Sequence, residues 1–382
     1  MTPGEPLISV VIPTRERAAK LRYTLQTVLS QPGDDFEVVV SDNASEDATA
    51  ETVSSFRDSR LRYFRTPSRL SMCDNWEFAF ERTTGKYLIY IGDDDALAPD
   101  SLNDLAAAVR DFAARLYCWE AHIYQWPGDG SPASLRHFAS RCATVRVNLG
   151  DLTRFSFRWG GLRYMRLPLL YHSLVERGVL EEIRRVTGRI FHSTQPDVFL
   201  AFAMPAVCAE AVRIGKPLSV YGASERAVDS GAIARREGAF AEKTHRFAAE
   251  YANYRFHPTL PPELPFWVKM IPDAMLVARD LFPDFYRDRP FDYDAMWAFL
   301  WRYWHFEGVR AILGRRREIR QRHPFHPARF CAFVAAHALS EARIAARRWR
   351  GAGPGRYRRS LPPENIAEFV RDLPAYDHGG AA

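Results

Sequence analysis

The first hundred residues alternate short apolar runs with segments of helical periodicity. Leu21, Leu25, Val28 and Leu29 are spaced to share one face of a helix, and a second helix is predicted near residues 75–80. Strands alternating with helices are typical of βαβ units, so we expect an α/β fold with a mostly parallel sheet flanked by helices. The predicted strands are residues 7–12, 36–40, 61–64 and 87–91.

The rest of the chain divides into two parts. Residues 116–119 and 143–147 have strand patterns, residues 174–186 have the pattern of an amphipathic helix, and Pro196 opens a further helix. Residues 219–238 are rich in Gly, Ala and Ser and are predicted to be a loop, either an active-site lid or a plain linker. From Phe240 onward the pattern is helical. We expect a first domain over residues 1–225 and a helical, basic C-terminal region over residues 226–382.

Three consecutive carboxylates, Asp93, Asp94 and Asp95, follow the apolar run 87–91 and the single Gly92. Because the carboxyl ends of parallel strands meet at one edge of a sheet, we expect them near Asp42 and the segment Pro13, Thr14 and Arg15. Adjacent carboxylates repel one another, and a divalent cation is the usual compensation. The alternative is a solvated acidic turn that caps the next helix.

The same segments carry a resemblance to a known family. Residues 9–15 read SVVIPTR, residues 40–49 read VSDNASEDAT, residues 75–76 read NW, and residues 85–97 read GKYLIYIGDDDAL. In this order they resemble the family 2 glycosyltransferases, which have the GT-A fold; the resemblance covers about the first hundred residues. It implies a nucleotide-sugar-binding part over residues 1–115 and an acceptor side over residues 116–225. Gly92 stands where the family often has a first acid, which leaves the division of labour among the three aspartates open.

The resemblance also implies roles for single residues. Pro13, Thr14 and Arg15 would border the nucleotide base, and Asp42 would accept a hydrogen bond from it. Asp95 would bind Mn²⁺ or Mg²⁺, with Asp93 or Asp94 reaching the ribose or the metal through water. The residues assigned to nucleotide binding are Pro13, Thr14, Arg15, Asp42, Arg69, Asp93 and Asp94, and those assigned to the metal are Asp95 and Asp93. An ordinary exposed arginine remains the alternative for Arg69.

Inverting members of the family place a catalytic carboxylate at a helix start well downstream of the metal motif. Asp197 is our candidate for this general base, although the family usually shows Glu-Asp where this chain has Pro196 and Asp197. A capping pattern is the alternative, because Thr194 could cap the helix with an acid three residues later. Glu181 and Glu182 are the next candidates.

The implied activity is transfer of a hexosyl group from a nucleotide-diphosphate sugar, UDP being favoured, to a glycan or lipid-linked hydroxyl in surface polysaccharide synthesis. A nucleotidyltransferase would need a Gly-rich phosphate loop after the first strand, and residues 13–17 contain no glycine. A catalytically silent sugar-nucleotide or glycan-binding protein also remains open.

Charge and cysteine usage refine the expected setting. The segment from Arg315 to Arg359 contains thirteen arginines and two glutamates, a local net charge of +11 in a chain of net charge +6. This favours an anionic partner such as a membrane surface, with a solvated helix face as the alternative. Nucleic acid is not expected, and homo-oligomer formation stays open. Five scattered cysteines and the lack of a spanning apolar run or signal pattern predict a cytoplasmic protein, peripheral at the inner face of the membrane if the basic region attaches there.

Overall fold

The computed structural model describes residues 5–127, 133–136, 143–161, 163–223, 251, 253–262, 264, 266–303, 316–349 and 363–378. Within these ranges the main sheet has the strand order β3-β2-β1-β4-β10-β6-β11-β9. Its first four strands are parallel, because β1 pairs with β2 and β4, and β2 pairs with β3. In chain order the strands are β1 (Ile8–Thr14), β2 (Phe36–Asp42), β3 (Leu61–Arg65), β4 (Tyr87–Tyr90), β6 (Leu116–Cys118), β9 (Val145–Asn148), β10 (Ser173–Glu176) and β11 (Glu210–Arg213).

A smaller sheet begins directly after the aspartates. Its strand order is β5-β12-β7-β8, with β12 antiparallel to β5 and parallel to β7. Its strands are β5 (Ala96–Leu97), β7 (His122–Gln125), β8 (Ser134–Arg136) and β12 (Ser219–Ala223).

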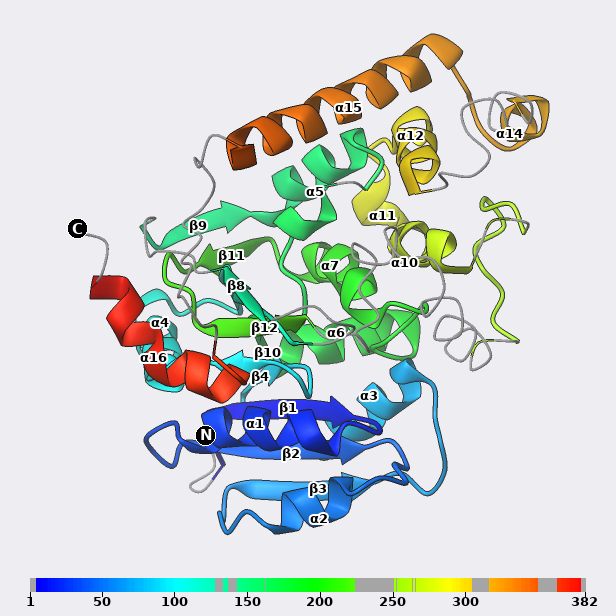
Figure 1. The fold of residues 1–382 in the computed structure, drawn as a ribbon. Coiled ribbons are helices and arrows are strands. Elements are labelled where there is room, and N and C mark those ends of the chain that lie inside the picture. Colours follow the sequence, from blue (N-terminus) through cyan, green and yellow to red (C-terminus); the bar gives the residue numbers. More distant parts are fainter. Residues whose placement is uncertain are drawn as a thin grey trace.

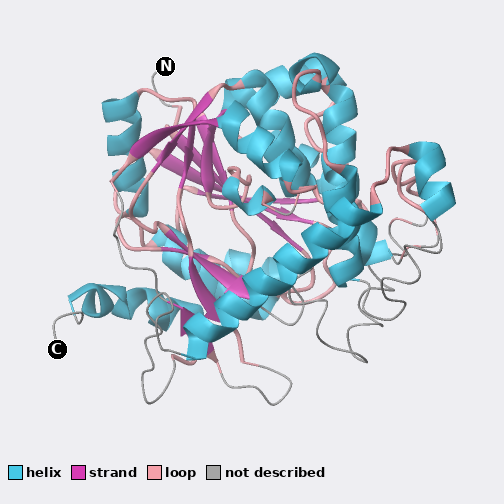
Figure 2. Ribbon diagram, turned by 90° about the horizontal axis from the view of Figure 1, so that it is seen from above, coloured by secondary structure: helices cyan, strands magenta, loops and turns pink. Residues whose placement is uncertain are grey.

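Helices cover both faces of the main sheet (Figures 1 and 2). Because side chains alternate along a strand, Val10 and Ile12 pack on one face and Val11 on the other. The first face carries α1 (Ala18–Leu29), α2 (Thr49–Ser54) and α4 (Ser101–Phe112). The second carries α3 (Met72–Phe80), α6 (Arg177–Thr187), α7 (Pro196–Val207) and α10 (Phe266–Leu281).

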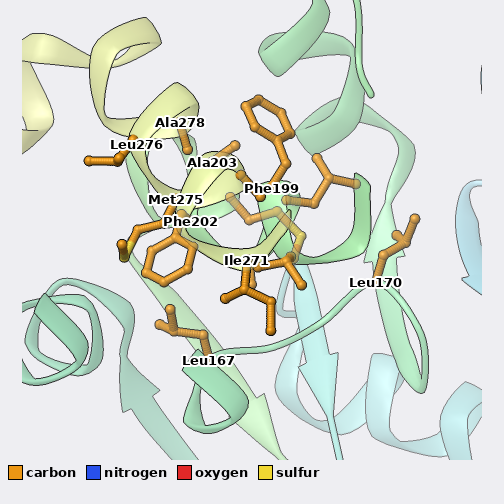
Figure 3. Packing of buried hydrophobic residues seen from close by; sticks show 14 of the residues in the cluster. Leu167, Leu170, Phe199, Phe202, Ala203, Ile271, Met275, Leu276 and Ala278 are labelled. Atoms are coloured by element: carbon orange, nitrogen blue, oxygen red, sulfur yellow. The ribbon is translucent and has the colours of Figure 1, made fainter. Parts of the chain in front are cut away.

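The C-terminal region packs on this core through several helices, two of which bear on the site. Helix α10 lies against α7, and the side chains between them are apolar (Figure 3). Helix α16 (Ile366–His378) covers the smaller sheet, where Phe369 stacks on Tyr124 and the Tyr124 hydroxyl donates to the Pro363 carbonyl. The remaining helices are α5 (Leu149–Arg158), a 3₁₀ turn (Tyr164–Arg166), α11 (Pro283–Tyr286), α12 (Tyr293–Tyr303), α14 (Arg316–Arg322) and α15 (Pro327–Trp349).

The expected fold class is confirmed: a mostly parallel sheet between helices, followed by a helical region. Two local predictions were wrong. The predicted helix 174–186 begins as strand β10 and only then continues as α6. The predicted loop 219–238 begins as strand β12, and its residues 224–238 lie outside the described ranges. Among the described helices, none combines the length and apolar character needed to cross a membrane.

Candidate functional site

The carboxyl ends of β1, β2 and β4 meet as the sequence predicted. Thr14 and Asp42 are register partners at the ends of β1 and β2. The Thr14 hydroxyl donates a 2.7 Å hydrogen bond to Asp93 Oδ2, which joins the end of β1 to the turn after β4. All three aspartates are buried. The candidate nucleotide residues and the acidic cluster therefore share one edge of the sheet.

Arg17 supplies positive charge to two of the three carboxylates. Its Nη1 lies 2.7 Å from Asp93 Oδ1 and 3.1 Å from Asp94 Oδ2. Burial disfavours the charged guanidinium, but the two carboxylates outweigh it and raise the pKa of Arg17. From the sequence, a divalent cation was expected to compensate the negative charge of the three aspartates. For Asp93 and Asp94, the protein itself supplies a counter-ion.

Asp95 is held mainly by the backbone. Its Oδ1 accepts the N–H of Gly222 at 2.8 Å, and its Oδ2 accepts the N–H of Gly92 at 2.6 Å. Burial raises the pKa of Asp95 to about 6, although these two N–H groups act in the opposite direction. A Cβ on Gly92 would come within 3.0 Å of carboxylate oxygens of both Asp94 and Asp95. A side chain at position 92 would crowd both carboxylates, which gives a physical reason for glycine there.

A chain of polar side chains ends beside Asp95. The Trp119 indole N–H donates to Ser219 Oγ at 2.8 Å, and Ser219 Oγ lies 2.8 Å from His172 Nδ1. The other ring nitrogen of His172, Nε2, is buried without a hydrogen-bond partner, 3.5 Å from Asp95 Oδ2. Burial lowers the pKa of His172 to about 4, so the imidazole is neutral at physiological pH. His172 also has a left-handed backbone, with φ of 58°.

The remaining candidates for nucleotide binding are Asp42, Pro13, Arg15 and Arg69. Both carboxylate oxygens of Asp42 are engaged, Oδ1 by the Ser45 N–H at 2.9 Å and Oδ2 by the Tyr63 hydroxyl at 2.5 Å. This fixes the carboxylate while leaving further lone pairs for a ligand. Pro13 and Arg15 are half-buried and flank Thr14, the register partner of Asp42. Arg69 is exposed, with Nη2 3.5 Å from Glu16 Oε1.

Asp197 lies in the first turn of α7 and is half-buried. The structure does not have the capping pattern expected as the alternative. The N-cap is Gln195 instead of Thr194, and no side chain caps the helix; the Thr194 hydroxyl is buried without a partner. Tyr171 is influenced by both Asp197 and the aspartate cluster. Burial raises the pKa of Tyr171, and the negative charges of Asp197 and of all three aspartates raise it further.

Glu181 and Glu182 lie elsewhere. Glu182 Oε2 is 3.5 Å from Arg115, which also binds Glu176 at 2.8 Å. Glu176 is paired with Tyr87 at the start of β4, whereas the aspartates follow its end. Glu182 therefore belongs to the opposite edge of the sheet, and Glu181 is exposed on the same helix.

Four residues of this site were not found from the sequence: Arg17, Tyr171, His172 and Gly222. Arg17 follows the strand-end segment 13–15 by two residues, and a basic residue expected near three carboxylates was an available signal. Tyr171 and His172 carried none, because the segment before β10 matches no periodic pattern. Gly222 was assigned to a loop.

The donor groups at Asp95 and His172 suit a divalent cation. Asp95 has lone pairs left beyond its two N–H partners, and His172 offers a buried nitrogen at its edge. Across the described ranges, no group of three or more His, Cys, Asp or Glu side chains could hold a metal ion. A cation here would take its other ligands from a diphosphate and water, as Mg²⁺ commonly does.

Comparison with known proteins finds a family match within the N-terminal part of the chain. Residues 9–173 match the family described as Glycosyl transferase family 2. The chain is 32% identical over 111 residues to the uncharacterized protein MT1568 of Mycobacterium tuberculosis, covering 29% of this chain and 35% of that protein. It is 26% identical over 115 residues to the GalNAc(5)-diNAcBac-PP-undecaprenol beta-1,3-glucosyltransferase of Campylobacter jejuni, covering 29% of this chain and 37% of that protein. The matches thus span little more than a third of these two relatives.

Among solved structures, S. aureus TarS 1-349 in complex with UDP-GlcNAc is similar to this chain. The TM-score is 0.49 at 15% sequence identity, with 87% of this chain and 92% of that chain covered.

Proposed function

We propose that the chain transfers a sugar from a nucleotide-diphosphate sugar to an acceptor hydroxyl, a proposal supported by the match of residues 9–173 to the family described as Glycosyl transferase family 2. The observation that carries the proposal is the meeting of Thr14, Asp42 and the three aspartates at one sheet edge, with Tyr171 within electrostatic range of both this cluster and Asp197.

The donor side is proposed to bind a UDP-sugar. Asp42 is held in a fixed orientation by Ser45 and Tyr63, which suits recognition of base N–H groups. Pro13, Thr14, Arg15 and Arg69 would border the nucleotide, and Asp93 and Asp94 would lie toward the ribose. A divalent cation, Mn²⁺ or Mg²⁺, would be held by Asp95 and His172, with Asp93 nearby; it would neutralise charge that develops on the departing diphosphate.

On the acceptor side, Asp197 is proposed as the general base. An acceptor hydroxyl is a poor nucleophile at neutral pH, so its proton passes to the Asp197 carboxylate as its oxygen bonds to the anomeric carbon. The bond from that carbon to the diphosphate breaks, and the nucleoside diphosphate leaves with the electron pair. A single displacement inverts the anomeric configuration. Half-burial in the first turn of α7 keeps Asp197 accessible to an acceptor.

The acceptor is proposed to be a glycan or a lipid-linked saccharide in surface polysaccharide synthesis. The name of the Campylobacter jejuni relative describes a lipid-linked acceptor, and the basic segment between Arg315 and Arg359 suits an anionic membrane surface.

Replacing Asp197 by Asn tests the base assignment. With any UDP-sugar that the wild type turns over, we expect the rate to fall about 10²–10⁴-fold while UDP affinity stays unchanged. Asp151→Asn is the matched control, because Asp151 is also a first-turn acid, on α5, and is exposed. Each variant loses up to about 1 kcal/mol of stability from its helix N-terminus. A destabilised but active Asp197→Asn would reject the assignment.

Binding of UDP alone tests the donor site. Calorimetry should show that Mn²⁺ strengthens UDP binding to wild type but not to Asp95→Ala. Equal wild-type affinity with excess chelator would contradict the cation proposal. Tight binding of UDP-sugars without transfer to any glycan or lipid-linked acceptor would favour a silent binding protein.

A further inference from the structure

The loop before Asp197 is fixed from two sides by residues far away in the sequence. Ser193 has a left-handed backbone, with φ of 68°, which a residue with a side chain adopts only when its surroundings impose it. The Cys73 thiol of α3 donates to the Ser193 carbonyl at 3.0 Å. The Ser193 hydroxyl donates to Asp273 Oδ2 at 2.7 Å. Only Thr194 separates Ser193 from Gln195, the N-cap of α7.

Asp273 comes from α10, in the C-terminal region, and is completely buried. Its Oδ2 also accepts the Tyr254 hydroxyl at 2.6 Å, and its Oδ1 accepts the His257 N–H at 2.7 Å. Burial raises the pKa of Asp273, while these donors and Ser193 favour its ionised form. A carboxyl group inside a helix interface is costly to bury, because water must be replaced by a full set of donors.

The surrounding interface does not require a polar group. Helix α10 packs on α7 through Ile271, Met275 and Ala278 on one side and Phe199, Phe202 and Ala203 on the other (Figure 3). The hydrogen bond from Ser193 to Asp273 adds a directional contact to this apolar packing, at the end of α7 that carries Asp197.

We propose that Asp273 is a positioning residue for Asp197, acting through Ser193 to fix where α7 begins. The inference rests on the proposed function, in which Asp197 is the general base. It gives the C-terminal region a role in the active site: α10 supplies the group that sets the base against the donor side. The loop then needs no rearrangement when substrate binds, and Asp197 is held ready for the acceptor hydroxyl.

Two variants that remove the same kind of hydrogen bond separate positioning from simple stability. Ser193→Ala and Tyr254→Phe each delete one hydroxyl that donates to Asp273 Oδ2, so we expect similar decreases in melting temperature. Only Ser193 lies on the loop that leads to Asp197. We expect Ser193→Ala to lower kcat about 10–100-fold, with the donor KM and UDP affinity unchanged, since small misplacements of a reacting group carry costs of this size. Tyr254→Phe should retain kcat within about twofold, because its hydroxyl is not part of that loop.

Further variants keep the test decisive. Ser193→Gly relieves the left-handed strain but still lacks the hydroxyl, so it should fold at least as well as Ser193→Ala and show the same loss of kcat. Asp273→Asn should behave like Ser193→Ala. In the Asp197→Asn background, Ser193→Ala should reduce the residual rate no further, because the residue that it positions is already disabled.

The outcomes are distinguishable from failure of the proposed function. If Asp197→Asn is inactive while Ser193→Ala and Ser193→Gly keep wild-type kcat, the positioning role is rejected and the base assignment stands. If Asp197→Asn is active, the base assignment itself fails. Equal loss of kcat in Ser193→Ala and Tyr254→Phe would reduce Asp273 to a stabilising group of the helix interface.

Discussion

Replacing Gly222 by Ala should damage both the stability of the smaller sheet and the donor site. The Gly222 N–H donates to Asp95, and a Cβ at this position would lie 1.7 Å from the Asp94 carbonyl oxygen and 2.9 Å from the Trp126 indole nitrogen. The first contact is with backbone, so a side-chain rotation cannot relieve it. Strand β12 and the turn at Asp94 must separate by more than an ångström.

Two effects lower the free energy of unfolding of Gly222→Ala. Overpacking of this kind costs about 1–3 kcal/mol, and occasionally more. Separation also stretches the 2.8 Å bond from the Gly222 N–H to Asp95, and hydrogen bonds to charged groups contribute about 1.5–3 kcal/mol. Together we expect a loss of about 2.5–6 kcal/mol, which lowers the melting temperature by roughly 3–8 °C in a protein of 382 residues. Because Asp94 and Asp95 move, UDP affinity in the presence of Mn²⁺ should fall at least about tenfold.

Thermal melts and calorimetry on the same preparation measure both effects. Gly178→Ala is the matched control: Gly178 lies in the first turn of α6, the nearest atom to its added Cβ is 3.5 Å away, and Ala is the better helix former by up to about 1 kcal/mol. We expect the control to keep its affinity and melt at or slightly above the wild-type temperature. A Gly222→Ala variant with wild-type melting temperature and UDP affinity would refute the placement of β12 against the aspartates.

Two further predictions concern charge. Buried Glu37 accepts hydrogen bonds from Ser9, Thr84 and Arg62. Burial alone would raise the pKa of Glu37, but these hydrogen bonds outweigh it and hold the pKa below its ordinary value. The ionised carboxylate therefore stabilises the fold at neutral pH, and this contribution is lost as pH falls through the folded-state pKa. Glu37→Gln should therefore cost about 1–3 kcal/mol at pH 7, a gap from wild type that narrows below about pH 4 in thermal melts; a gap independent of pH would contradict the role of the charge. The region between Arg315 and Arg359 should give attachment to phosphatidylserine vesicles that weakens steeply with salt in co-sedimentation, and failure to bind at low salt would return its arginines to an ordinary solvated surface.

The parallel half of the fold was predictable because its signals are local. Buried parallel strands read as continuous apolar runs, and β1, β2 and β4 each end in a polar residue or turn. Strand β10 was missed because its four residues join α6 without a break, and β12 because glycine and alanine resemble a loop. What makes β12 a strand is pairing with β5 and β7, more than ninety residues earlier, and no local pattern records such a register.

The same distinction applies within the acidic cluster. Three adjacent aspartates look equivalent in the sequence, yet their partners differ. Asp93 and Asp94 meet the guanidinium of Arg17, 76 residues from Asp93 in the chain. Asp95 accepts hydrogen bonds from two backbone N–H groups, one of them 127 residues away, and lies 3.5 Å from ring nitrogen Nε2 of His172. Long-range contacts therefore distinguish three carboxylates that look alike in the sequence.

The same contacts distinguish the three carboxylates as candidates to bind a cation. Asp93 and Asp94 share a permanent counter-ion, so a metal would have to compete with Arg17 for them. Asp95 has no comparable ion pair with a basic side chain, and the 3.5 Å to His172 Nε2 leaves the two groups unbonded. Ser219 can either donate to His172 Nδ1 or accept from it, and only the second arrangement leaves a lone pair on Nε2. Coordination of a cation by Nε2 would therefore require the imidazole proton to lie on Nδ1, with Ser219 Oγ accepting both this N–H and the indole N–H of Trp119.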